Sequence, residues 1–184
     1  MQGIVFDQLH AYADHLGPQA WDAILQDSGI SRHTYLVTEG YPDDELEALV
    51  TSAASLLGRT RDEVLLDFGR FLSAGLLSIY GVFLDKKWGL REVLLNTEST
   101  IHRVVRLRDP DADPPRLRIV EGPRSDQVTI VYDSPRRMCW LGKGIIEGLA
   151  SEYETPITIR DVRCMQTGDP HCEMSVSIGA TNGG

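Results

Sequence analysis

The sequence predicts an α+β fold, in which helices occupy the first part of the chain and a four-stranded antiparallel sheet the last part. Three observations support this expectation. Apolar side chains recur at helical spacing up to about residue 107. The segment 109–115 reads DPDADPP, and its three prolines cannot continue a helix because they lack the backbone donor and restrict the preceding residue. Short strand-like runs follow this break.

Five helices are expected before the break. The third begins with Asp43, Asp44 and Glu45, as the positive end of the helix dipole favours. Thr60, with Glu63 three residues later, has the spacing of a capping box and opens the fourth helix. The expected helices cover about residues 4–16, 18–26, 43–57, 60 onward and 88–107, and the last is expected to be the longest.

The last third is expected to hold four strands and one helix. The strands cover about residues 116–121, 127–132, 157–164 and 172–178, and the helix covers about 138–153. We expect residues 1–180 to form one domain, with a helical lobe over 1–60 and an α+β lobe over 61–180. Residues 181–184 read as a disordered tail.

Composition excludes several classes of protein. The chain has 27 acidic against 18 basic side chains and a net charge of -9, which argues against nucleic acid and anionic membrane surfaces as partners. No apolar stretch is long enough to span a membrane, and no secretory signal is recognisable. Three cysteines do not make a disulfide framework, so a cytoplasmic protein is expected. Hydrolase, P-loop and zinc-protease motifs are absent from the sequence.

His102 is the first candidate for chemistry. It lies in the predicted helix 88–107 beside an apolar stripe that includes Leu95 and Val105. One interpretation is a histidine at the edge of the core with its ring nitrogens hydrogen-bonded. The other is a single imidazole ligand to a haem iron.

Tyr132, Ser134 and Arg136 alternate at the end of a predicted strand, so they are expected to share one face. Two hydroxyl groups and a guanidinium suit one or two carboxylates held close together. The alternative is a strand end with three solvated polar side chains.

Together these features resemble the haem nitric oxide/oxygen binding (H-NOX) family, which is related to the haem domain of soluble guanylate cyclase. The resemblance covers nearly the whole chain and is of the stand-alone bacterial type. It implies a b-type haem between the two lobes, with His102 as proximal ligand, Pro115 pressing on the macrocycle, and the Tyr-x-Ser-x-Arg side chains on the propionates. The matching pieces are Met1–Phe6, His102, Pro114-Pro115-Arg116, Tyr132-x-Ser134-x-Arg136 and Gly144–Gly148.

The resemblance also allows the distal side of the haem to be read. Oxygen-binding members carry a tyrosine at the position of Leu141, and Leu72 occupies a second position that can be polar. With Ile4 and Ile145 the pocket is expected to be apolar, which favours NO and CO and disfavours O2. The indole of Trp140, next to Leu141, is the donor that would weaken this expectation.

Cys139, Cys164 and Cys172 suggest a second site. Their spacing alone makes zinc a weak prediction, and buried structural thiols are the ordinary alternative. Some members of the resembled family hold zinc through three cysteines and a histidine, and Asp161 stands at the histidine position. A site of three cysteines and Asp161 is one expectation, His171 is a substitute ligand, and a thiol switch is another alternative.

The function that the resemblance implies is a cytoplasmic NO sensor and not an enzyme. NO at the ferrous haem would weaken or break the bond from His102 to iron, and the change would pass to a separate histidine kinase or diguanylate cyclase. Two other functions stay open. One is a zinc or thiol redox sensor that uses the three cysteines. The other is a haem-free small-molecule-binding module, because the segment from Cys164 to Cys172, continuing to Glu173, also resembles 4-vinyl reductase-type domains.

Overall fold

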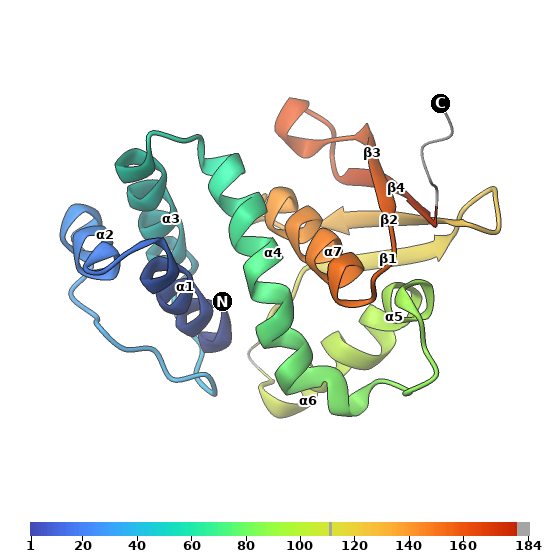
Figure 1. The fold of residues 1–184 in the computed structure, drawn as a ribbon, viewed down its shortest axis with the longest axis horizontal. Coiled ribbons are helices and arrows are strands. Elements are labelled where there is room, and N and C mark those ends of the chain that lie inside the picture. The colour runs from blue at the N-terminus through green and yellow to red at the C-terminus, as the bar shows by residue number, and fades with distance from the viewer. Residues whose placement is uncertain (111, 180–184) are drawn as a thin grey trace.

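The computed structural model describes residues 1–110 and 112–179, so the expected tail at 181–184 lies outside the described residues. Helices form one side of the molecule and a sheet covered by a helix forms the other (Figure 1). The α+β prediction is confirmed, with helices first and an antiparallel sheet after them. The helical side contains α1 (Gly3–Leu16), α2 (Ala20–Ser28) and α3 (Asp43–Leu57).

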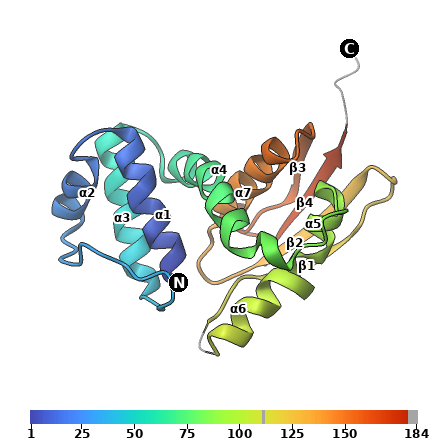
Figure 2. The same cartoon turned by 60° about the horizontal axis from the view of Figure 1, so that its bottom comes forward.

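Helix α4 (Arg61–Tyr80) runs through the centre of the molecule and joins its two sides (Figures 1 and 2). Thr60 and Glu63 form the predicted capping box at its start. The stretch Arg61–Phe83 is long and apolar enough to cross a membrane by composition. Its apolar face is instead packed in the core, where Phe68 and Leu72 are almost fully buried.

Two glycines allow α4 to cross α7 (Cys139–Glu152) at close range. A Cβ atom at Gly144 would lie 2.1 Å from the carbonyl oxygen of Leu66 and 2.8 Å from the Cα of Gly69. Neither neighbouring atom belongs to a flexible side chain, so only glycine fits at this crossing.

The prediction of one long helix over 88–107 is wrong in two respects. The segment consists of α5 (Leu90–Thr97), a π-helical turn (Glu98–His102) and α6 (Arg103–Arg108), and the longest helix is α4 with 20 residues. Side chains at the end of α5 bond back to the helix, since Thr97 Oγ1 donates to the carbonyl of Val93 at 2.9 Å. Such side-chain bonds compete with the backbone hydrogen bonds of the helix, and here they lie next to the point where the helix widens into the π-helical turn.

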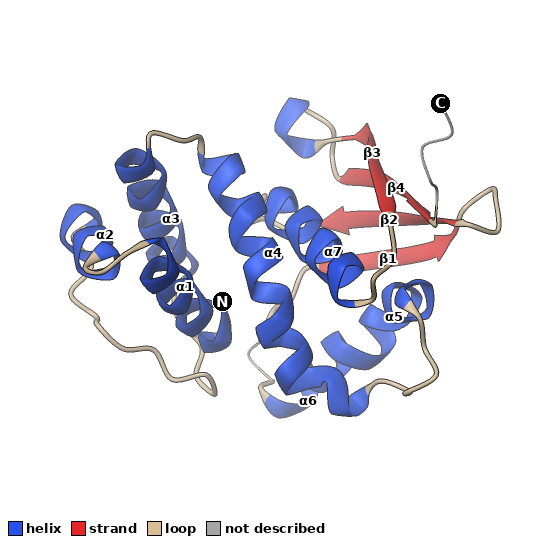
Figure 3. Ribbon diagram, viewed as in Figure 1, coloured by secondary structure: helices blue, strands red, loops and turns tan. Residues whose placement is uncertain are grey.

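The sheet contains four strands in the order β1-β2-β4-β3, and every neighbouring pair is antiparallel (Figure 3). Their buried face packs against α7, while the charged side chains of β1 and β3 are exposed. Strand β3 ends one residue before the predicted end, and a short 3₁₀ turn over Met165–Thr167 follows. The strands are β1 (Arg116–Glu121), β2 (Gln127–Asp133), β3 (Ile157–Arg163) and β4 (Cys172–Ile178).

The core has two apolar clusters. The first fills the helical side and includes residues of α4, and the second lies between α7, α5 and the sheet. Trp140 and Ile145, both on α7, pack against both clusters. The boundary between lobes at residue 60 stays a prediction, because α4 belongs to the packing of the helical side.

Candidate functional site

Two adjoining cavities lie where α4, the 98–102 turn and the sheet meet. Their volumes are about 560 Å³ and about 170 Å³. The smaller is lined almost entirely by apolar side chains, among them Ile130 and Ile146. Together they fall in the size range of small-molecule and cofactor sites, roughly 300–1,000 Å³. Both cavities are lined by Leu76, Tyr80, Ile101, His102 and Pro115.

A larger hollow of about 1060 Å³ opens between α3 and the turn before α7. Charged side chains such as Asp44, Glu47 and Arg137 line it, and His102 does not. Neither His102 nor Tyr132 lines this hollow, so the two smaller cavities are the candidate site.

His102 is held as a neutral, hydrogen-bonded imidazole. Its side chain is 13% exposed, and Nδ1 lies 2.8 Å from Oε2 of Glu98. Burial lowers the pKa of His102, although Glu98 acts in the opposite direction. Because a carboxylate accepts at Nδ1, we assign the proton to that nitrogen, which leaves the lone pair on Nε2. Nε2 has no hydrogen-bond partner in the part of the chain that the structure describes.

Tyr132, Ser134 and Arg136 come together as the alternation predicted, although the strand ends at Asp133. Tyr132 and Ser134 are buried and Arg136 is half-buried, whereas the intervening residues Asp133 and Pro135 are exposed. The hydroxyl of Tyr132 accepts from the backbone N–H of Met138 at 3.3 Å, so its own proton stays available to donate. The three polar groups are therefore positioned by a turn and not by a continuous strand.

Arg136 connects this turn to the helical side. Nη1 donates to the carbonyl of Asp113 at 2.5 Å, and Nε lies 2.8 Å from Oδ2 of Asp43. The second contact is an ion pair without hydrogen-bond geometry, so Nε is buried with no acceptor among the described residues. Burial works to raise the pKa of Asp43, but Arg136 and the amino group of Met1 prevail and lower it.

The residues expected around the gas divide into two groups. Ile4 lines the larger cavity and Ile145 the smaller. Leu72 and Leu141 are buried in the helical core and line neither cavity. The ring of Trp140 also lines neither; it lies under the ammonium group of Lys143, 3.7 Å from Nζ.

Sequence reasoning missed two residues of this site. Tyr80 lines both cavities, and burial raises the pKa of its hydroxyl. Glu98 bonds to His102 and also accepts from Nη2 of Arg106. The signal for Glu98 was present, because an acidic residue four positions before a histidine lies on the same helix face.

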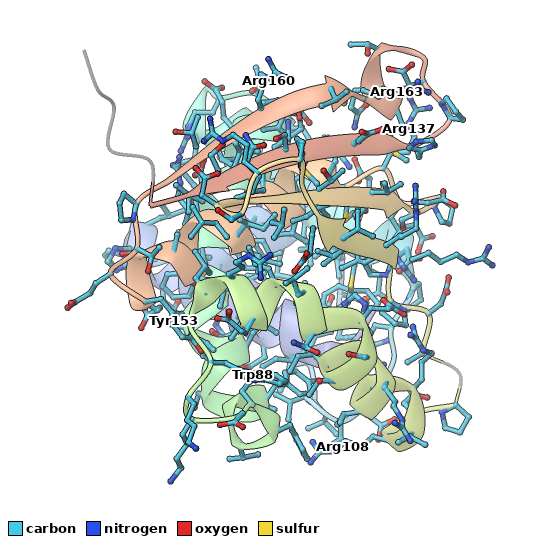
Figure 4. The ribbon with its side chains drawn as sticks, turned by 90° about the vertical axis from the view of Figure 1, so that its right-hand side faces the viewer. Trp88, Arg108, Arg137, Tyr153, Arg160 and Arg163 are labelled. Carbon is cyan, nitrogen blue, oxygen red and sulfur yellow. The ribbon has the colours of Figure 1, made fainter. Side chains whose placement is uncertain are left out.

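The three cysteines converge at the end of the sheet opposite the β1–β2 loop. The Sγ atom of Cys164 lies 3.9 Å from that of Cys139 and 3.7 Å from that of Cys172, and all three lie within 4.8 Å of one another. Burial raises the pKa of the Cys139 and Cys172 thiols. Arg137, labelled in Figure 4, donates through Nη2 to the carbonyl of Met165 and so holds the turn that follows Cys164.

Asp161 is not part of the cysteine cluster. Its Oδ2 lies 2.6 Å from Nζ of Lys143, whose side chain is 6% exposed. His171 places no ligand atom in the cluster either. Of the described residues, only Cys139, Cys164 and Cys172 are arranged to hold a metal ion there.

Comparison with protein families gives a match over most of the chain. The haem-NO-binding model matches residues 2–161. The chain belongs to the haem-NO-binding, or H-NOX, family. A comparison with curated proteins gave no match.

Solved H-NOX structures have the same fold. A crystal structure of an H-NOX protein from S. oneidensis in the Fe(II)NO ligation state is 27% identical, with a TM-score of 0.89 over 97% of this chain and 99% of that one. An NMR structure from Shewanella oneidensis in the Fe(II)CO state is also 27% identical, with a TM-score of 0.86 over 99% of each chain. The unliganded Fe(II) H-NOX protein from K. algicida is 22% identical, with a TM-score of 0.86 over 99% and 98% of the two chains.

The residues of the two cavities fit a haem. The two cavities together would receive the macrocycle, and a neutral imidazole with an unbonded Nε2 lines both of them. At their edge, the buried Nε of Arg136 is paired with the charge of Asp43 but has no hydrogen-bond acceptor in good geometry among the described residues. A propionate carboxylate would satisfy it together with the hydroxyl groups of Tyr132 and Ser134.

Proposed function

We propose that this H-NOX domain is a gas sensor that binds NO at a ferrous b-type haem. The observation that carries the proposal is His102, a buried neutral imidazole whose Nδ1 is occupied and which lines an apolar cavity of an H-NOX fold. When bound, the haem supplies a ferrous iron with one position for His102 and one for a diatomic gas. No C-x-x-C-H motif occurs in the sequence, so the attachment is non-covalent.

The other site residues hold and shape the group. Tyr132, Ser134 and Arg136 bind the propionates through two hydroxyl donors and one guanidinium. Pro115 lines both cavities beside His102, and its rigid ring would press on a macrocycle bound there.

The apolar lining sets the preference among gases. Bound O2 is polarised and needs a hydrogen-bond donor, whereas NO and CO bind without one. Ile4 and Ile145 offer none, while Leu72 and Leu141 form an apolar layer behind them. Tyr80, and not Trp140, is the side chain that could donate a hydrogen bond to a bound gas, because Tyr80 lines both cavities.

The signal starts at His102 and ends on another protein. A weaker or broken bond from His102 to iron would leave His102 and the 98–102 turn free to move relative to α4. A partner responds only if it distinguishes the two states. We propose a histidine kinase or a diguanylate cyclase as that separate chain, and a sensor role for this domain in place of catalysis.

Visible spectroscopy of the reduced protein under anaerobic conditions tests the proposal. We expect a five-coordinate ferrous haem, a five-coordinate nitrosyl after NO, and no stable oxy complex in air. His102→Ala should shift the Soret band of the ferrous protein, because it removes the proximal ligand, and His33→Ala, a change of an exposed loop histidine, should not. Failure of the folded protein to bind haem after reconstitution would refute the proposal.

A second candidate function rests on the cysteine cluster. Four ligands about 2.3 Å from a tetrahedral zinc lie about 3.8 Å apart, which matches the two Sγ–Sγ distances of 3.7 and 3.9 Å. We propose that the cluster binds zinc through three thiolates, or acts as a redox-sensitive thiol site when empty. Asp161 is paired elsewhere, so water or another exchangeable ligand completes the metal site.

Metal content measured by mass spectrometry separates these roles. Zinc near one equivalent, lost in Cys164→Ser while haem content is unchanged, supports the metal site. A zinc-free protein whose thiols form a reversible disulfide supports the redox site. Neither zinc nor reversible oxidation would leave three structural thiols.

A further inference from the structure

We propose that Glu98 is a positioning residue for His102, and that the Glu98–Arg106 pair sets the strength of the bond from His102 to the haem iron. The inference rests on the proposed function, because it concerns a bond that exists only if His102 is the iron ligand. It deepens that function by naming the side chains that adjust how readily NO breaks the bond.

The geometry joins three side chains in series. Oε2 of Glu98 lies 2.8 Å from Nδ1 of His102, and Oε1 accepts from Nη2 of Arg106. The carboxylate thus uses a different oxygen for each partner. His102 is the buried end, with 13% of its side chain exposed, whereas Glu98 and Arg106 are 34% and 41% exposed. The series therefore runs from the cavity to the protein surface.

An ordinary ion pair between residues four apart does not describe this contact. Such a pair requires a proton on both ring nitrogens, whereas a histidine that binds iron through Nε2 carries its proton on Nδ1 alone. Oε2 of Glu98 lies 2.8 Å from that Nδ1 and can only accept. The contact is therefore a hydrogen bond from a neutral imidazole to a carboxylate.

A carboxylate at Nδ1 has a defined effect on the opposite nitrogen. It fixes the tautomer and the plane of the ring, and it increases the electron density that Nε2 donates to a metal. Arg106 acts against this effect, because its positive charge draws electron density from the same carboxylate. Glu98 thus strengthens the bond to iron and Arg106 limits that strengthening.

The π-helical turn holds the two groups together. Glu98 begins the turn and His102 ends it, and Arg106 lies one turn further along α6. π-Helical turns are uncommon and occur often at functional sites. Here the wider turn carries both the imidazole and its acceptor, so Glu98 is positioned by the same backbone as His102.

Resonance Raman spectroscopy of the ferrous protein measures the bond directly through the iron–histidine stretching band. We expect the band to shift to lower frequency in Glu98→Gln, which keeps an acceptor without the charge, and further in Glu98→Ala. Arg106→Met should shift it to higher frequency. Arg103→Met is the matched control and should leave the band unchanged, because it removes an exposed charge next to His102 that forms no hydrogen bond or ion pair with Glu98 among the described residues.

Two further measurements follow the same series. Haem loss to a scavenger should accelerate by about 10-fold or more in Glu98→Ala, as expected for loss of a hydrogen-bond partner behind a metal ligand. In the CO complex of protein labelled with ¹⁵N-histidine, the Nδ1 proton of His102 should be protected from exchange in the parent chain and exposed in Glu98→Ala.

The outcomes separate this inference from the proposed function. If the band persists in His102→Ala, His102 is not the ligand and both fail. If the band is lost in His102→Ala but unchanged in Glu98→Gln and Arg106→Met, only the role of Glu98 fails. Should Glu98→Ala not fold, the near-isosteric Glu98→Gln and the opposite shift in Arg106→Met decide the question.

Discussion

Asp161→Asn removes the charged partner of a buried ammonium group while keeping nearly the same shape. Nζ of Lys143 lies 2.6 Å from Oδ2 of Asp161 and 3.7 Å from the centre of the Trp140 ring. In the variant, Lys143 keeps its contact with the Trp140 ring but loses the negative charge that Asp161 supplied. Lys143 is 6% exposed, so water cannot replace the lost carboxylate without opening the packing of α7 against β3.

The expected cost lies between two limits. Removing one partner of a fully buried pair costs about 3–5 kcal/mol, whereas exposed pairs are worth about 0.2–1 kcal/mol. Asp161 is 41% exposed, so water already weakens the pair, and we expect the free energy of unfolding to fall by about 2 kcal/mol. For a domain of this size that corresponds to a Tm lower by about 4–8 °C.

Urea and thermal unfolding of four proteins test this value: the parent, Asp161→Asn, Lys143→Met and the double variant. Methionine fills the volume of the lysine stem without a charge, so Asp161→Asn should cost less than about 0.5 kcal/mol in that background. Asp133→Asn, at the exposed end of β2, serves as a surface control. Equal losses from Asp161→Asn in both backgrounds would refute the claim that the pair itself carries the energy.

Three other changes give distinct outcomes. Gly144→Ala sets a Cβ against the backbone oxygen of Leu66, so urea unfolding should show a loss of about 2 kcal/mol, a typical cost of overpacking. Asp43→Asn should destabilise the protein at neutral pH. The native pKa of this carboxyl is lowered, so its stabilisation is complete above the unfolded value near 4 and is lost as the pH falls through the native one; the two unfolding curves should converge in acid and stay apart at pH 7. If they also differ equally in acid, the ion pair with Arg136 is not the cause. Ile145→Tyr should give an oxy complex that is stable in air and Ile145→Phe should not, because Ile145 lines the smaller cavity and only the first change adds a donor; identical spectra would show that position 145 does not reach the gas.

Most elements could be predicted because their signals are local. The helix over 43–57 and the strand over 116–121 match the structure to the residue. The first has an acidic start and ends at Gly58, and the second lies between a proline pair and a Gly-Pro turn. The division of the 88–107 segment could not be predicted, because its residues favour a continuous helix and no residue in it marks where the helix widens.

The residues that line the site could be predicted in part, but the distances of other expected residues from the cavities could not. His102, Tyr132 and Arg136 could be identified from the sequence and line one or both cavities, whereas Ser134 lines neither, and their role toward a haem stays a prediction. Leu141 and Leu72 could not be placed, because their distance from the cavity depends on how closely α4 and α7 cross, and Gly144 decides that crossing. The pairing of Asp161 was also hidden, since nothing in the sequence marks Lys143 as buried.

The π-helical turn makes the chain unequally tolerant of different kinds of genetic change. Loss of one residue from Glu98–His102 would close the wide turn and let α5 and α6 merge into one regular helix. Because a π-helical turn holds one residue more than an α-helical turn, the side chains of α6 would keep their faces and Val105 would stay in the core. A deletion between Glu98 and His102 would instead shorten their spacing, and the carboxylate would lose its position opposite Nδ1. Related genes that lack one codon here should therefore encode a domain that folds but holds its histidine differently.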